Sequence, residues 1–161
     1  MNSRRPAIRH IFISPEHNFF GHHNQEPGQW PAQSCLEVEC KKGSGLVGDR
    51  YFNHKPDYKG QITFFEWETF VRIREEFAVP HLVSSDFRRN VITSGLDLNG
   101  LIGIEFELQG VRFLGTEEAR PCHWMNRVIA EGAKEALEGS GGLRAKILSD
   151  GRLRVDASDV S

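Results

Sequence analysis

Cys122 is the residue of this chain whose surroundings best suit it to do chemistry. Arg120 and Pro121 precede it and His123 follows it. A thiol that lies beside basic groups and at the start of a helix is favoured as the thiolate, which attacks electrophiles and binds soft metal ions. Taken alone, a cysteine is more often a small buried apolar side chain, so the interpretation depends on the residues that accompany it.

Two further segments contain groups suited to anions. Arg88 and Arg89 lie upstream of the cysteine, and Gly141, Gly142 and Arg144 lie downstream. A guanidinium group binds phosphate or carboxylate through parallel hydrogen bonds. An arginine pair is often a solvated pair of charges and a Gly-Gly pair often only a turn. Together, however, the three segments predict a site where sulfur meets an anionic ligand.

The glycine-rich segment 43–48 matches the G-x-G-x-x-G pattern of dinucleotide-binding folds. That fold needs a helix to begin at this point, so that the helix N-terminus meets the pyrophosphate. The residues that follow show no helical period and reach Pro56. We therefore expect a tight turn that presents Asp49 and Arg50.

The histidines raise the question of a metal site, chiefly His17, His22 and His23 in a long loop. Zinc sites usually contain paired ligands such as C-x-x-C or H-E-x-x-H, and neither occurs. Cys35 and Cys40 lie on opposite faces of an expected strand, so they cannot share one ion. We expect the loop histidines to make hydrogen bonds.

Length and composition describe one globular domain, residues 1–161, that is 39% hydrophobic and 26% charged. A chain of this length buries roughly two thirds of its unfolded surface. The net charge of −2 provides no basic surface for nucleic acid. No apolar run approaches the ~20 residues of a membrane helix, and the odd number of cysteines favours reduced thiols and a cytoplasmic location.

Short strands dominate the expected secondary structure. Apolar or alternating runs occupy residues 8–14, 35–40, 61–65, 102–108 and 111–114. Within 102–108, Ile102 and Ile104 are expected to face the core together with Phe106 and Leu108. Turns at 109–110 and 150–151 predict two hairpins, of which the second joins 143–147 to 153–155.

Helical periodicity appears in 66–77 and 123–137, and the second helix would begin directly after Cys122. Many short strands with two helices predict a mainly β protein, specifically a mixed β-barrel with a few peripheral α-helices. No repeat or interdomain linker is visible.

Five segments in this order resemble the MOSC domain, the module named for the C-terminal part of molybdenum cofactor sulfurases. They are 45–51, 88–93, 98–103, 121–122 and 141–145. Each segment is weak alone, but the order makes the resemblance specific, and it covers residues 11–155. The chain is too short to include the desulfurase domain of full sulfurases, so it is similar to the stand-alone bacterial type.

The resemblance implies a MOSC-type β-barrel and a site for the molybdenum cofactor. In members that bind the cofactor, the cysteine matched by Cys122 ligates molybdenum. The segment matched by 88–93 helps hold the pterin and its phosphate, which makes Arg88 and Asn90 cofactor contacts and Thr93 a weaker one. Further family signatures match Asp49, Arg50, Gly141, Gly142 and Arg144.

Two functions remain open on this resemblance. The first is a molybdenum-dependent reductase of N-hydroxylated small molecules, which would need a separate electron-donor protein because no Fe–S spacing or flavin motif appears. The second is a non-redox protein in which Cys122 carries sulfur as a persulfide or delivers cofactor to an accepting protein. A cysteine hydrolase with His123 as base is disfavoured, since adjacent residues rarely align for proton transfer.

Overall fold

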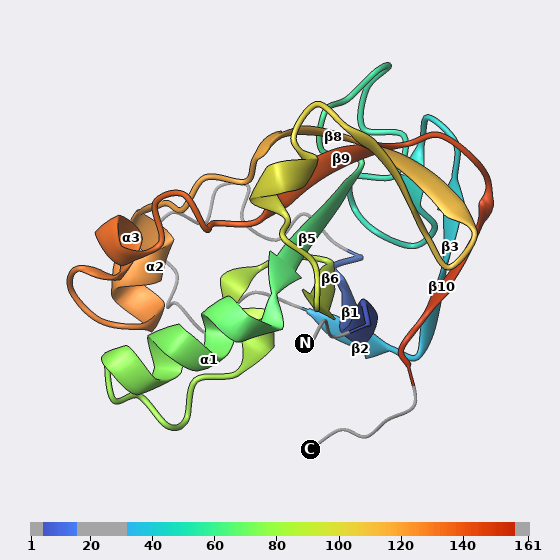
Figure 1. Ribbon diagram of the computed structural model, residues 1–161. Coiled ribbons are helices and arrows are strands. Elements are labelled where there is room, and N and C mark those ends of the chain that lie inside the picture. Colours follow the sequence, from blue (N-terminus) through green and yellow to red (C-terminus); the bar gives the residue numbers. More distant parts are fainter. Residues whose placement is uncertain (1–4, 16–31, 157–161) are drawn as a thin grey trace.

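The computed structural model describes residues 5–15 and 32–156 (Figure 1). The strands are β1 (Ala7–Ile13), β2 (Gln33–Cys35), β3 (Glu37–Lys41), β4 (Gly45–Leu46), β5 (Ile62–Glu66), β6 (Val91–Ser94), β7 (Glu105–Leu108), β8 (Val111–Glu118), β9 (Leu143–Ile147) and β10 (Gly151–Arg154). The helices are α1 (Trp67–Glu76), α2 (His123–Val128) and α3 (Ala133–Ala136), with 3₁₀ turns η2 (Ser84–Phe87) and η3 (Asn99–Leu101).

The strands form two sheets. The larger has the order β2-β1-β6-β5-β9-β8-β7, and the smaller has the order β10-β3-β4. The expectation of a mainly β protein with few helices is confirmed. The closed barrel is not confirmed, because both sheets are open over the residues that the structure describes.

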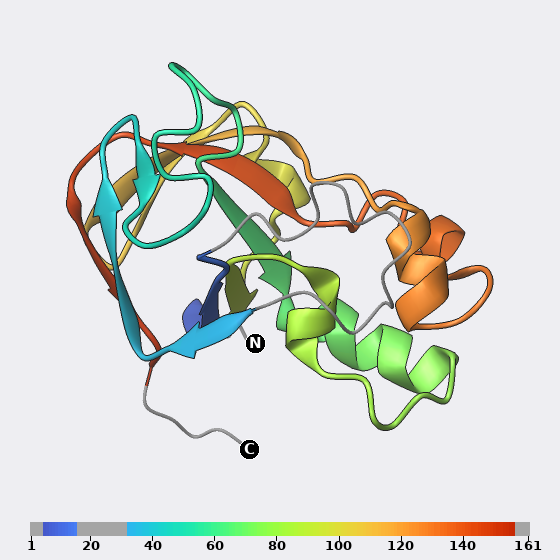
Figure 2. The same cartoon turned by 180° about the vertical axis from the view of Figure 1, so that it is seen from behind.

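Two hydrophobic cores lie on opposite faces of the larger sheet. Neighbouring residues of a strand point to opposite faces, so Phe64 of β5 enters one core and Phe65 enters the other. Val91 and Ile92 of β6 divide in the same way. Each of these central strands therefore buries two successive apolar residues, one in each core, as expected of the parallel pair that β5 and β6 form. In Figures 1 and 2 the helices gather at one end of the molecule and β3 and β10 at the other.

One of the two expected hairpins is wrong. Leu108 pairs with Val111, so the β7–β8 hairpin is confirmed. β9 and β10 form as strands but do not pair with each other, because β9 lies between β5 and β8 while β10 pairs with β3. The turn between them leads from the larger sheet to the smaller one. The Asp150 carboxylate in this turn accepts the Lys42 N–H at 2.8 Å, which holds the chain near β3.

The expected helix over 123–137 is two short helices instead of one. Gly132 has a φ of +92°, which a continuous α-helix excludes. The side-chain oxygen of Asn126 accepts the Lys134 N–H at 2.9 Å and so helps fix the start of α3. The broad apolar face on which the prediction rested is still buried, since Met125, Ile129 and Leu137 all join the second core.

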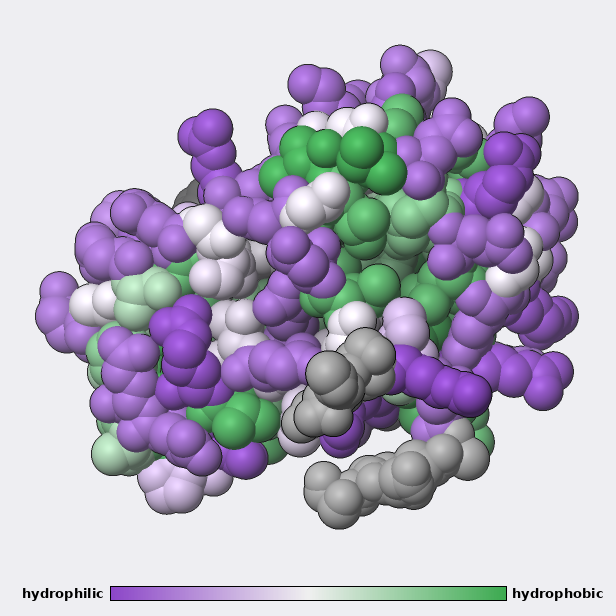
Figure 3. Space-filling model, in the orientation of Figure 1, coloured by the Kyte–Doolittle hydropathy of each residue, from purple (hydrophilic) through white to green (hydrophobic). Residues whose placement is uncertain are grey.

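The strand expected over 102–108 begins only at Glu105. The preceding residues form η3 and a turn, in which Ile102 and Ile104 are 39% and 48% exposed instead of facing the core. The surface over η3 is accordingly hydrophobic in Figure 3. The alternating pattern was misleading here because the turn breaks the period of two that a strand requires.

Candidate functional site

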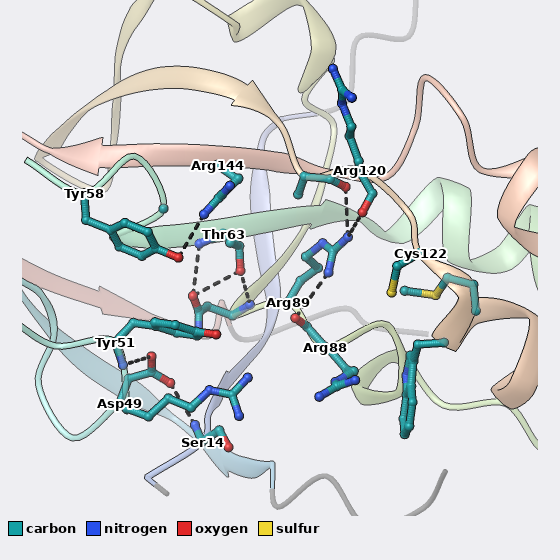
Figure 4. Close-up of a pocket in the computed structure, with 16 residues that line it drawn as sticks. Ser14, Asp49, Tyr51, Tyr58, Thr63, Arg88, Arg89, Arg120, Cys122 and Arg144 are labelled. Atoms are coloured by element: carbon teal, nitrogen blue, oxygen red, sulfur yellow. Dashed lines mark hydrogen bonds between the residues drawn. The ribbon is translucent and has the colours of Figure 1, made fainter. Parts of the chain in front are cut away.

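A cavity of about 360 Å³ lies where the end of β8, the loop after β4 and the η2–β6 loop meet (Figure 4). Six of the residues predicted from the sequence line it: Asp49, Arg50, Arg88, Asn90, Cys122 and Arg144. They come from segments that are far apart in the chain. The folding of the larger sheet therefore brings together the thiol segment and the arginine segments, as the sequence predicted.

Cys122 occupies the position directly before α2, and its side chain is exposed at the cavity. Its carbonyl oxygen accepts the Met125 N–H at 2.9 Å and so begins the helix. Two guanidinium groups lie within electrostatic range. Burial lowers the pKa of Arg88 and lowers that of Arg89 to about 10, and the coulombic interaction of each arginine with Cys122 acts in the opposite direction. Arg89 therefore remains protonated at neutral pH.

Sequence reasoning named Arg89 only as one of an arginine pair and did not include it among the cofactor contacts. Its Nε donates to the Gly141 carbonyl at 2.9 Å, its Nη1 to Phe87 at 3.0 Å and its Nη2 to Ala119 at 2.9 Å. One buried guanidinium thus ties η2, the end of β8 and the turn before β9 together behind the cavity. The only signal in the sequence was its place beside Arg88. Every residue has a backbone carbonyl, so the sequence does not show which carbonyls will accept its hydrogen bonds.

Arg88 presents its charge beside α2. Its backbone is left-handed, with a φ of +63° at the end of η2, which is uncommon for a residue other than glycine. Its guanidinium lies 4.2 Å from the ring centroid of Trp124, within the range of a cation–π contact. Trp124 is in turn held by its Nε1–H, which donates to the Asp86 carbonyl at 3.1 Å.

Asn90 is used mainly to hold strands together. Its Oδ1 accepts from the backbone N–H of Thr63 at 3.0 Å and from the hydroxyl of Thr63 at 3.1 Å. Its Nδ2 donates to the Phe12 carbonyl at 3.1 Å. The side chain therefore links β5, β1 and the start of β6, and one Nδ2 hydrogen remains beyond these contacts.

The turn after β4 presents Asp49 and Arg50 as expected, and no helix begins there. Asp49 is buried, and its two carboxylate oxygens accept the backbone N–H groups of Ser14 at 2.8 Å and Tyr51 at 3.1 Å. Asp49 therefore braces the cavity wall. The guanidinium of Arg50 lies 4.9 Å from the ring centroid of Tyr51.

Arg144 reaches the far side of the cavity from β9. Its Nη1 pairs with the Glu117 carboxylate at 2.7 Å, and its Nη2 donates to the Tyr58 hydroxyl at 2.9 Å. Tyr58 stacks on Tyr51 with ring centroids 5.7 Å apart. Sequence reasoning assigned neither tyrosine to the site, although aromatic residues in a largely polar loop were a usable signal.

The comparisons with known proteins identify the family of this chain. The family model described as "MOSC domain" matches residues 44–158, well over half of the chain. The chain belongs to the MOSC domain family. A search of curated protein sequences returned no match.

Solved structures share the fold of this MOSC domain. The YuaD protein from Bacillus subtilis is 19% identical, with a TM-score of 0.67 over 96% of this chain and 94% of its own. YiiM from Escherichia coli is 16% identical, with a TM-score of 0.64 over 96% of this chain and 71% of its own. YiiM from Geobacillus stearothermophilus is 13% identical, with a TM-score of 0.66 over 93% and 71%. At these identities the likeness concerns the fold alone.

Three of the predicted residues lie outside the cavity lining of the MOSC domain. Thr93 is wholly buried on β6. Gly141 contributes its carbonyl to Arg89, and Gly142 packs its backbone against Phe64. The two glycines therefore let the backbone before β9 lie close to its neighbours, and they do not contact the cavity.

The loop histidines His17, His22 and His23 lie outside the described residues. No described helix is long and apolar enough to cross a membrane.

The three thiols of the MOSC domain should react with iodoacetamide at different rates. Cys122 is exposed, whereas burial raises the pKa of Cys35 and, with Glu39, raises that of Cys40 to about 12. At neutral pH we expect Cys122 to react at least about tenfold faster than Cys35. Cys40 should react only after unfolding. Peptide mapping over a time course, with and without denaturant, measures this, and equal rates for Cys35 and Cys122 would contradict it.

Proposed function

We propose that this MOSC domain binds the molybdenum cofactor in the cavity, with the Cys122 thiolate as the protein ligand to molybdenum. The observation that carries the proposal is that the exposed thiol opens into the same cavity as Arg88, Arg89 and Arg144. A soft sulfur donor beside guanidinium groups suits a metal that arrives in an organic ligand bearing negative charge.

The donor set fits a metal held mainly by its own organic ligand. Among the described residues, no group of three or more His, Cys, Asp or Glu side chains is arranged to hold a bare ion. One thiolate alone would leave such an ion under-coordinated. The hydroxyl of Ser14 supports a polar ligand, because Ser14 is 1% exposed and lines the cavity while its Oγ has no hydrogen-bond partner among the described residues.

Each side chain then has a distinct role. Cys122 holds the metal, Arg88 and Arg144 bind the phosphate, and Arg89 keeps the thiol segment in place through the Ala119 carbonyl. The remaining Nδ2 hydrogen of Asn90 is available to the pterin edge. When bound, the cofactor supplies two-electron redox chemistry, and we propose N-hydroxylated small molecules as substrates, with a separate protein as electron donor.

Metal and pterin analysis tests the proposal directly. The protein is purified from a host that makes the molybdenum cofactor and from an otherwise identical host that does not. Molybdenum and pterin in equal amounts in the first preparation, with neither in the second, are expected. Folded protein free of both from the cofactor-producing host would count against cofactor binding.

Arg88→Lys should weaken cofactor retention without unfolding the domain. Lysine keeps the charge but lacks the planar fork of donors and the flat face that rests on Trp124. We expect about a 5- to 30-fold loss of affinity, which corresponds to about 1–2 kcal/mol. The measurement is molybdenum occupancy after dialysis, and Arg127→Lys, an exposed arginine outside the cavity lining, is the matched control. If both variants retained molybdenum equally, Arg88 would contribute no more to cofactor binding than an arginine elsewhere on the surface.

The exposure of Cys122 supports a second candidate, a carrier that passes sulfur or cofactor to a partner protein. A thiol at the surface is accessible to another protein as well as to a small molecule. Intact-mass analysis of protein prepared without reductant distinguishes the two candidates. One additional sulfur atom on Cys122, without molybdenum, favours the carrier.

A further inference from the structure

We propose that Cys122 is a site of reversible S-thiolation, forming mixed disulfides preferentially with low-molecular-weight disulfides that carry carboxylates, such as glutathione disulfide. This inference requires only the thiol and the cationic cavity, so it does not depend on cofactor binding. The modification would occupy the sulfur that the proposed function needs and would therefore act as a redox-controlled block of the site.

Access distinguishes Cys122 from the other two thiols. Its side chain is exposed at the cavity, while Cys40 is wholly buried in the first core. Cys35 lies at the sheet edge, and its Sγ contacts the Gln33 carbonyl at 3.7 Å. A disulfide exchange reaction needs an open approach to the attacking sulfur, and Cys122 combines this with the positive charge of Arg88 and Arg89.

The cavity provides groups that recognise the carboxylates of the incoming molecule. Arg88 and Arg144 line it with Cys122, and the guanidinium of Arg89, whose N–H groups are bonded to backbone carbonyls, adds positive charge behind them. Both oxygens of Asp49, the one carboxylate among its described lining residues, already accept backbone N–H groups. Glutathione disulfide carries more carboxylates than ammonium groups, so the net attraction favours it over a neutral or cationic disulfide.

The buried hydroxyl of Ser14 provides a second group for binding a ligand, which an isolated surface cysteine would lack. Its Oγ is buried without a hydrogen-bond partner in the part of the chain that the structure describes, and the residue lines the same cavity as Cys122. A buried hydroxyl without a partner is costly, and a bound carboxylate oxygen can accept its hydrogen bond. An extended peptide-like ligand can place one carboxylate toward Arg88 and another toward this hydroxyl.

The reaction is balanced without a further reagent. The Cys122 thiolate attacks one sulfur of the disulfide, the old S–S bond breaks, and the other half leaves as a thiolate that takes up a proton from solvent. Cys122 is oxidised and the leaving half is reduced. Excess free thiol reverses the exchange, which restores the Cys122 thiol.

The test uses cofactor-free protein and three disulfides: glutathione disulfide, neutral hydroxyethyl disulfide and dicationic cystamine. Each rate is divided by the rate of the same disulfide with N-acetylcysteine, which removes intrinsic differences in reactivity. Intact mass and peptide mapping should show one adduct, on Cys122. After normalisation, glutathione disulfide should exceed cystamine by about tenfold or more, and the difference should shrink in roughly 1 M salt.

Arg88→Gln should reduce this preference about 3- to 10-fold, whereas Arg112→Gln, the same charge change outside the cavity, should leave it unchanged. Arg144→Gln provides the same test if Arg88→Gln fails to fold, as judged by thermal unfolding. Equal normalised rates for the three disulfides, equal behaviour of the Arg88 and Arg112 variants, or an adduct mainly on Cys35 would each overturn the proposal. Because no molybdenum is present, such a failure leaves the cofactor proposal standing.

Discussion

Cys122→Ser is expected to remove molybdenum from protein prepared in a cofactor-producing host, with at least about a 100-fold loss of retention. A serine hydroxyl is a hard donor that stays protonated at neutral pH, so it cannot replace a soft thiolate. The thiol is exposed, and the fold should therefore keep its stability within about 0.5 kcal/mol. Elemental analysis at matched protein concentration and a thermal unfolding curve measure the two effects.

Cys35→Ser is the matched control for this substitution. It makes the same atomic change at a cysteine outside the cavity lining, and it should leave molybdenum content unchanged. If Cys122→Ser kept as much metal as Cys35→Ser, the thiol would not be a ligand. The arginine cavity would then have to hold the cofactor without it.

Gly142→Ala is expected to destabilise the domain by about 3 kcal/mol or more. Gly142 has a φ of +110°, which disfavours any residue with a side chain, and a Cβ at this position would overlap the Phe64 carbonyl oxygen. That oxygen belongs to the central strand β5 and cannot move independently of the sheet. Chemical denaturation, compared with the wild-type protein, measures the loss.

Gly139→Ala separates the two causes of the loss, which are backbone strain at positive φ and steric overlap with Phe64. Gly139 also has a positive φ, of +85°, but nothing lies within 4 Å of the added Cβ. Its cost should be about 1 kcal/mol, from backbone strain alone. If the two variants lost equal stability, the close approach to Phe64 would contribute nothing, and the packing of the turn before β9 against β5 would need another explanation.

Local patterns predicted the elements of the fold well. The apolar run of β5, the β7–β8 hairpin and α1 all follow from residue periodicity and nearby turn residues. Pairing between distant strands did not follow. The turn at Asp150-Gly151 has the composition of a hairpin, but its direction is decided by the backbone N–H of Lys42, which is 108 residues away in sequence. The α2–α3 break likewise depends on the conformation of Gly132.

The residues of the candidate site likewise include some that the sequence could predict and some that it could not. Arg88 and Cys122 were predictable because charge and sulfur are properties of the residues themselves, and the family resemblance supplied their association. The roles of Arg89 and Asn90 were not predictable, because their partners are mostly backbone carbonyls and one threonine. Whether an arginine faces a ligand or spans three loops is decided by tertiary geometry, which the residue types do not encode.

The contacts of Arg89 have a consequence for the motions of the cavity. The carbonyls that it holds, at Phe87, Ala119 and Gly141, belong to loops separated by tens of residues, yet one side chain joins them. None of the three loops can open alone without breaking hydrogen bonds to a buried charge. The cavity wall is therefore one cooperative opening unit, whose amides should exchange with solvent at a common free energy. A ligand that contacts any one loop would slow the opening of all three.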